Sequence, residues 1–175
     1  MVFSLMPDWH NTGLCGMHLR EMNDADIGTV ARLLEVLARE YFLGACSPEQ
    51  ASTFLRDNDA AAIRRLVAQG YAYHVAEIGG QLAGFIAVRD RSHVYHLFVA
   101  AAFHRRGIAR SLWQHAKAAA VAAGGEGSFT VNASNYAVPM YESLGFARTL
   151  PMQCKDGLEF NPMVYPVSAP LVGAA

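Results

Sequence analysis

One segment in the middle of the chain constrains the fold more than any other. Residues 93–99, HVYHLFV, are rich in aromatic and β-branched side chains and predict a buried strand. A short connection leads to Gly107, and the Ala-rich run after it predicts a long helix that ends at Gly124 and Gly125. A strand that passes through a glycine turn into a helix indicates a domain in which helices pack against a sheet.

The remaining patterns place this unit in a mixed α/β domain. Apolar residues at helical spacing predict a first helix that has its N-cap candidates at 23–26 and runs to about 42. Further helices are expected from the capping Ser47 onward and over 60–68. Further strands are expected at 17–22, 71–78, 81–89, 128–132, 146–152 and 158–164, and a short helix at 136–144. We therefore expect a central, mostly antiparallel mixed sheet of about seven strands, flanked by about four helices.

Length and composition favour one globular domain, because the chain has 175 residues and 53% of them are hydrophobic. We expect a loosely ordered N-terminal arm at 1–16, the single domain at 17–166 and a C-terminal tail at 167–175. The first ten residues do not resemble a signal peptide, and no apolar run approaches the roughly 20 residues of a membrane span, so we expect no membrane contact. Cys15, Cys46 and Cys154 lack CxxC spacing, which indicates reduced thiols in the cytoplasm and no metal site.

The turn before the long helix has the chemistry of a phosphate site. A helix N-terminus offers free N–H groups and the positive end of its dipole, and Gly107 lets a ligand approach the backbone closely. Arg105, Arg106 and Arg110 supply local positive charge, although the net charge of −1 argues against nucleic acid as a partner. An ordinary solvated loop is the alternative interpretation of the turn.

Two segments together resemble the GNAT superfamily of acetyl-CoA-dependent N-acetyltransferases. HRRGIA at 104–109 resembles motif A of the family, which usually has Gln or Arg where this chain has His104. NYAVPMYESLGF at 135–146 resembles motif B, which ends in Tyr-x-x-Leu-Gly-Phe. The resemblance implies a GNAT-like fold with splayed fourth and fifth strands, acetyl-CoA as co-substrate and no metal.

The resemblance also implies how acetyl-CoA binds. The pyrophosphate would lie on the backbone of 104–109, and the pantetheine arm would pair with the strand at 93–99, where Leu97 N–H faces the thioester oxygen. Asn135 would hold another part of the cofactor, or it caps the helix that follows. The implied cofactor-binding residues are Leu97, Phe98, Val99, His104, Arg105, Arg106, Gly107, Ile108, Ala109, Arg110 and Asn135.

Two residues are candidates for proton transfer. Tyr141 stands where the family has its general acid, and a phenol stays protonated at neutral pH; its alternative interpretation is a core aromatic. His93 has the family's spacing for a base that acts through water, with Tyr95 as a neighbour that orders the water, or it is a structural residue. Strand alternation would put His93, Tyr95 and Leu97 on one face, with Val94 and a packing His96 on the other.

The expected function is transfer of an acetyl group from acetyl-CoA to a primary amine of a small molecule, a peptide or a protein, by direct attack through a tetrahedral intermediate. A catalytically weak acyl-CoA-binding sensor is the alternative. The acceptor pocket is expected around Tyr41, Phe42, Leu43 and Phe160, with Glu40 nearby, unless these apolar residues only form core. The chain would act as a monomer or a homodimer.

Overall fold

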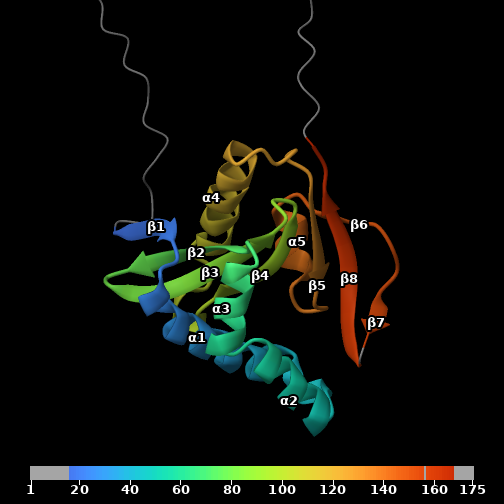
Figure 1. Ribbon diagram of the computed structural model, residues 1–175. Helices are drawn as coiled ribbons and strands as arrows, with labels where there is room; N and C mark the ends of the chain where they lie inside the picture. The colour runs from blue at the N-terminus through green and yellow to red at the C-terminus, as the bar shows by residue number, and fades with distance from the viewer. Residues whose placement is uncertain (1–15, 156, 168–175) are drawn as a thin grey trace, which may run out of the picture.

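The computed structural model describes residues 16–155 and 157–167. All of the predicted N-terminal arm but Gly16, all of the predicted tail but Val167, and Cys15 lie outside the described residues. Figure 1 shows an open sheet with helices on both sides. The strands are β1 Met17–Glu21, β2 Ala72–Ile78, β3 Gln81–Arg89, β4 His93–Val99, β5 Phe129–Ala133, β6 Ala147–Arg148, β7 Gln153–Lys155 and β8 Leu158–Tyr165. The α-helices are α1 Ile27–Tyr41, α2 Pro48–Asp57, α3 Ala60–Ala68, α4 Ile108–Ala122 and α5 Val138–Ser143.

The sheet separates two hydrophobic clusters. Its strand order is β1-β2-β3-β4-β5-β8-β6, with β7 paired to β8 outside this path. The helices α4 and α5 pack on one face, where Leu112 and Trp113 are buried. The helices α1 and α3 pack on the other face, where Leu34 and Ile63 are buried. The predicted mixed sheet is therefore confirmed, and the described residues form eight strands and five α-helices in place of about seven and about four.

The last predicted hairpin is partly wrong. The strand expected at 146–152 is only β6, two residues long, and the chain pairs with β8 again as β7 from Gln153. Pro151 lies in the gap between these two strands, and proline has no N–H for a ladder hydrogen bond. The expected start of the first helix is confirmed, because Asp26, one of the N-cap candidates, is the N-cap of α1, and Asn23 caps a single 3-10 turn, Asp24–Asp26, before it.

The strands β4 and β5 pair only at their start. They run parallel, with His93 opposite Thr130 and Val94 opposite Val131, and the ladder ends there. On its other edge β4 pairs with β3 over its whole length. The predicted separation of the fourth and fifth strands is thus confirmed, and it leaves one edge of β4 open.

Backbone groups of β4 point into this opening. Ala100 N–H donates to Ala83 O at 2.9 Å, so Ala100, and with it Phe98 two residues earlier, direct their backbone groups toward β3. Alternate residues of an antiparallel strand direct their N–H and C=O to opposite edges. Leu97 and Val99 therefore direct theirs toward the gap between β4 and β5.

A β-bulge in β4 changes which side chains share a face. Ala87 of β3 lies opposite His96, whereas the next residue, Val88, lies opposite Val94. Tyr95 is the extra residue between them. A bulge of this kind interrupts the alternation of side chains along a strand.

The expected alternation along β4 is therefore wrong after Tyr95. Leu97 joins Val94 against the α4 side of the core, and Tyr95 packs against the α1 side. The rings of Tyr95 and His96 are neighbours, with their centroids 4.5 Å apart. Leu97 thus does not share a face with Tyr95, and His96 does.

Candidate active site

A cavity of about 1180 Å³ occupies the gap between β4 and β5. Its lining includes Tyr141 and Ile108, which belong to the core on the α4 side, and Phe54 and Tyr95, which pack against the core on the α1 side. The cavity is therefore continuous through the sheet and has one half on each face. We call these halves the phosphate half, next to α4 and α5, and the acceptor half, next to α1 and α2.

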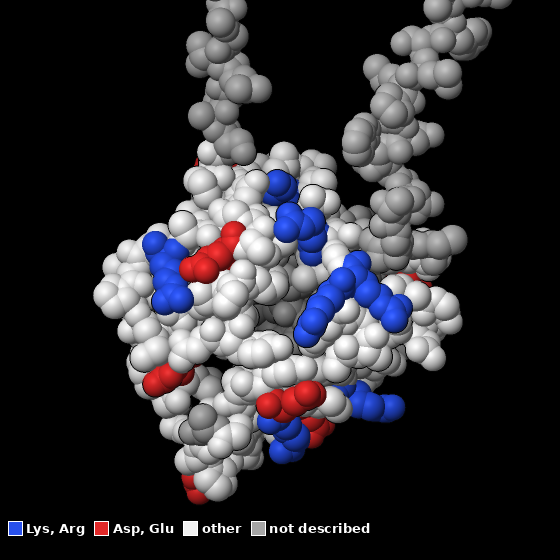
Figure 2. Space-filling view, turned by 180° about the vertical axis from the view of Figure 1, so that it is seen from behind, with Lys and Arg blue, Asp and Glu red and all other residues white. Residues whose placement is uncertain are grey.

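The turn that opens α4 has two residues in the left-handed backbone conformation. Arg105 has φ 60° and Gly107, the N-cap of α4, has φ 76°. Turns of this kind direct successive N–H groups into one concavity that can bind an anion. Seen from behind, the molecule has a hollow near its centre, with Lys and Arg side chains on the rim (Figure 2). Positive charge is thus concentrated locally in a chain whose net charge is −1.

The charged side chains near this turn also hold the fold together. Arg110 Nη2 donates to Ser143 O at 3.0 Å and so links α4 to the end of α5. The Arg106 guanidinium lies 5.5 Å from the centroid of the Phe103 ring, and Arg106 is not part of the cavity lining. Of the three predicted arginines, Arg105 and Arg110 line the cavity.

His104 contacts the end of its own strand. Its Nε2 lies 2.8 Å from Val99 O, and since a carbonyl only accepts, the ring nitrogen donates. In this conformation the Nε2 N–H of His104 is used within the protein, and the side chain links the turn to β4.

Tyr141 is buried and opens onto the cavity. Tyr141 is 5% exposed, and its ring packs edge-on against the Phe146 ring, with the centroids 5.3 Å apart. Burial raises the pKa of the Tyr141 hydroxyl above its ordinary value. Among the residues that the structure describes, none hydrogen-bonds this hydroxyl. The phenol is thus protonated at neutral pH and has its proton available to a group in the cavity.

Asn135 lies in a chain of amide hydrogen bonds next to the gap. Asn161 Nδ2 donates to Asn135 Oδ1 at 2.8 Å, and Asn135 Nδ2 donates to Glu159 at 2.8 Å. The alternative that Asn135 caps the next helix is wrong, because the N-cap of α5 is Ala137. Asn135 lines the cavity and keeps one N–H and one lone pair for a ligand.

The two histidines of β4 do not lie where we expected, because His96, and not His93, lines the cavity. His93 lies at the paired end of β4, where its Nδ1 is 2.7 Å from Thr130 Oγ1, and it does not line the cavity. Burial, with Arg89 nearby, lowers the pKa of His93. His96 does line the cavity, its Nδ1 is 3.3 Å from the Tyr73 hydroxyl, and burial lowers its pKa to about 3.

An aromatic pair that the sequence did not indicate lies at the edge of the cavity. Tyr41, the last residue of α1, stacks on Tyr136 with ring centroids 4.5 Å apart, and both line the cavity. Tyr136 is 60% exposed, so this stack is formed at the surface. The contact joins α1 to the loop before α5, two segments that are distant in the sequence.

The structure brings together most of the predicted site. The predicted residues that line the cavity are Tyr141, Leu97, Phe98, Val99, His104, Arg105, Gly107, Ile108, Ala109, Arg110 and Asn135. His93 and Arg106 do not. In the acceptor half Tyr41, Phe42 and Phe160 line the cavity as expected, whereas Leu43 is buried in the core. Phe54 and Asn58 also line it, and no sequence motif indicated them.

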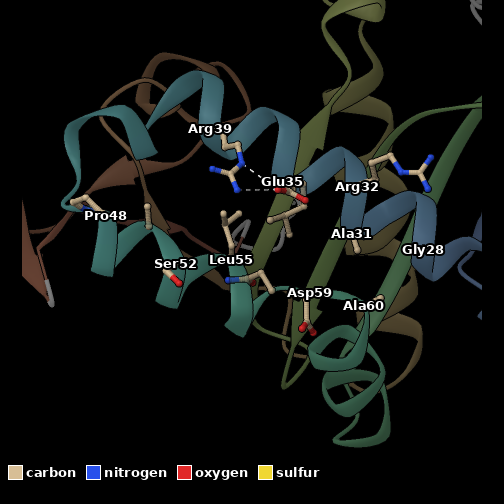
Figure 3. A pocket seen from close by; sticks show the side chains of 13 residues that line it. Gly28, Ala31, Arg32, Glu35, Arg39, Pro48, Ser52, Leu55, Asp59 and Ala60 are labelled. Atoms are coloured by element: carbon tan, nitrogen blue, oxygen red, sulfur yellow. Dashed lines mark hydrogen bonds and ion pairs between the residues drawn. The ribbon is translucent and has the colours of Figure 1, made fainter.

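A second hollow, of about 730 Å³, lies between α1 and the segment of α2 and α3. In Figure 3 the Arg39 guanidinium points to Glu35 across one turn of α1, with Nη2 and Oε1 3.0 Å apart. Among the described residues, no cluster of His, Cys, Asp and Glu could hold a metal ion. In the same part of the chain, no helix is long and apolar enough to cross a membrane.

Comparison with known proteins gives one family and one fold. The model of the acetyltransferase (GNAT) domain matches residues 42–167. No curated protein sequence matches the chain.

Three solved structures with the same fold illustrate the likeness. A GCN5-related N-acetyltransferase from Rhodopseudomonas palustris has a TM-score of 0.73 at 20% identity, covering 88% of this chain and 98% of its own. PaiA N-acetyltransferase from Thermoplasma acidophilum, in complex with coenzyme A, has a TM-score of 0.70 at 15% identity, with coverages of 85% and 98%. YncA from Salmonella typhimurium, with acetyl-CoA, has a TM-score of 0.67 at 20% identity, with coverages of 91% and 99%.

Proposed function

This chain belongs to the GNAT acetyltransferase family, and from this premise we propose that it transfers an acetyl group from acetyl-CoA to a primary amine by direct attack. The observation that carries the proposal is the open edge of β4, where Leu97 and Val99 direct backbone groups toward the cavity. An extended pantetheine arm could hydrogen-bond there as an added strand does. PaiA and YncA, which share the fold, contain coenzyme A and acetyl-CoA respectively.

The residues at the turn suit the other end of that ligand. The first N–H groups of α4 and the left-handed residues Arg105 and Gly107 would bind a pyrophosphate, with Arg110 nearby. Asn135 would bind the cofactor through the hydrogen-bonding capacity that Asn161 and Glu159 leave free. An N–H group on a phosphate is a charge-assisted hydrogen bond and is stronger than a neutral one.

Three groups would perform the chemistry. The amine nitrogen forms a bond to the acetyl carbon, and Leu97 N–H would stabilise the negative charge that develops on the acetyl oxygen. As the carbon–sulfur bond breaks, the Tyr141 hydroxyl would donate its proton to the leaving sulfur. The amine loses a proton to a base, and His93 would serve through a chain of waters, since it does not line the cavity.

The proposal is tested by incubating the protein with acetyl-CoA and a panel of primary amines. We expect one CoA thiol to be released for each amine that is acetylated. Mass spectrometry should show the amine about 42 Da heavier, the mass that one acetyl group adds. Tight binding of acetyl-CoA with no acetylated product from any amine would instead support the alternative, an acyl-CoA sensor. Absence of acetyl-CoA binding would contradict both.

The role of His93 is tested by the pH dependence of kcat/KM. A base must be unprotonated, and the lowered pKa of His93 puts the acidic limb of the profile below the ordinary value of about 6.5. Activity should rise with pH through this limb, and His93→Ala should remove the limb and lower kcat/KM by about 10²-fold. His18→Ala, whose ring is exposed on β1, is the control and should keep the limb. An unchanged limb in His93→Ala would place the base elsewhere.

A further inference from the structure

We propose that the acceptor half of the cavity selects a primary amine carried on an aromatic or bulky apolar body that has no carboxylate or phosphate group. This assignment rests on the proposed acetylation of an amine and adds the chemistry of the rest of the acceptor. It follows from the walls of this half, from its charges and from one buried amide.

The walls of the acceptor half are mainly apolar. Phe42 and Phe54 pack edge to face with centroids 5.0 Å apart, and Tyr95 packs in the same manner against Tyr71, also at 5.0 Å. The apolar and aromatic side chains that line this half include Leu37, Phe42, Phe54, Tyr95, Leu158 and Phe160. Such walls favour a ligand body that is itself apolar, because its transfer from water is favourable.

The charges of the cavity are divided between its halves. Its basic side chains, Arg105 and Arg110, belong to the turn and the start of α4, in the phosphate half. Among the described residues that line the acceptor half, none is Lys or Arg. Glu159 of β8 accepts from Asn135, and strand alternation puts it on the opposite face of β8 from Leu158 and Phe160. An anionic group that enters the acceptor half would therefore be desolvated with no cation to pair with it.

Asn58, the C-cap of α2, adds a hydrogen-bond acceptor to this half. The residue is 6% exposed, and its Nδ2 donates to Phe54 O at 2.8 Å. Its Oδ1 is buried and has no partner among the described residues. One of the two amide N–H groups is thus used, and the free oxygen complements an N–H or O–H group of a ligand.

The nearby arginines do not alter this charge pattern. Asn58 also lines the second hollow (Figure 3), whose lining includes Arg32 and Arg39 of α1. Neither arginine lines the main cavity, and Arg39 is paired with Glu35. His96 adds no cation either, because burial lowers its pKa to about 3 and keeps the ring neutral.

Three matched amines test the proposal with the full-length protein and acetyl-CoA. They are 2-phenylethylamine, phenylalanine, which adds a carboxylate to the same body, and putrescine, which lacks the apolar body. From thiol release, we expect kcat/KM for 2-phenylethylamine to exceed that for each of the others by about tenfold or more. A best rate with phenylalanine or putrescine would overturn the proposal and leave the acetyl-transfer function intact.

A positive charge introduced into the acceptor half tests whether the absence of a cation there is the reason that carboxylates are disfavoured. Leu158→Arg supplies the missing cation and should raise kcat/KM for phenylalanine relative to 2-phenylethylamine by about tenfold. Val67→Arg makes a similar change on the exposed side of α3, outside the cavity, and should leave the ratio unchanged. Equal ratios in the native protein and Leu158→Arg would contradict the assignment of this half.

Calorimetric binding of the same amines to the CoA-bound protein separates the two proposals. If no amine is acetylated, the acetyl-transfer function fails, yet tighter binding of 2-phenylethylamine than of phenylalanine would still support the acceptor half as proposed. Equal binding of the two, or binding of neither, would overturn the acceptor assignment.

Discussion

Tyr141→Phe is expected to lower kcat by about 10²–10⁴-fold, the usual contribution of a positioned general acid. The substitution removes the one group of this side chain that can donate a proton and keeps the ring that packs on Phe146. Because no described residue hydrogen-bonds the hydroxyl, its loss leaves no protein group unpaired, and the free energy of unfolding should hardly change. Stopped-flow measurement of acetyl transfer, with denaturant unfolding, checks both expectations, and calorimetry measures the affinity for acetyl-CoA.

The matched control for this variant is Tyr71→Phe. Tyr71 is a half-buried tyrosine that packs on Tyr95 and does not line the cavity. Tyr71→Phe should have the kcat of the native protein, and both variants should keep the native affinity for acetyl-CoA. A normal kcat in Tyr141→Phe would show that the leaving sulfur takes its proton from another source.

Gly107→Val is expected to weaken acetyl-CoA binding by about 10- to 100-fold. Gly107 has φ 76°, a conformation that costs other residues about 1–2 kcal/mol, and a β-branched residue least tolerates it. The turn would relax toward a different backbone, and its N–H groups would no longer point at one phosphate. Each hydrogen bond to a charged group contributes about 1.5–3 kcal/mol, so the loss of one accounts for the expected change.

Gly70→Val separates this effect from general backbone strain. Gly70 has φ 90°, and a Cβ there, as at Gly107, would meet no atom within 4 Å. Both variants should therefore lose stability to a similar extent in thermal unfolding, but only Gly107→Val should lose affinity for acetyl-CoA. If the two variants bind acetyl-CoA equally well, the pyrophosphate does not lie on the backbone of this turn.

Local patterns predicted much of this structure. The capping box at Ser47, with Gln50 three residues later, was enough to predict where α2 begins, because both side chains act within one turn. The glycine turn before α4 was equally predictable, since only the conformation of Gly107 and the start of a helix are involved. These features depend on neighbours in the sequence.

The errors come from contacts between distant segments. The bulge at Tyr95 exists only in the pairing of β4 with β3, so the alternation of β4 alone could not reveal that His96 reaches the cavity. Asn58 lines the cavity because α2 ends beside β4, and no motif contains that information. The acceptor half, which joins α1, α2 and β8, was accordingly the least predictable part of the site.

The short ladder between β4 and β5 also means that a ligand bound between these strands would contribute to the stability of the fold. Only two residue pairs join these strands, so the sheet consists of two well-paired parts, β1 to β4 and β5 with β8 and β6, with a gap between them. A ligand that hydrogen-bonds to Leu97 and packs on β5 would fill this gap and join the two parts of the sheet, as an added strand does. Ligand binding and unfolding are then linked equilibria, and saturation at a hundredfold excess over Kd would stabilise the native state by about 2.7 kcal/mol.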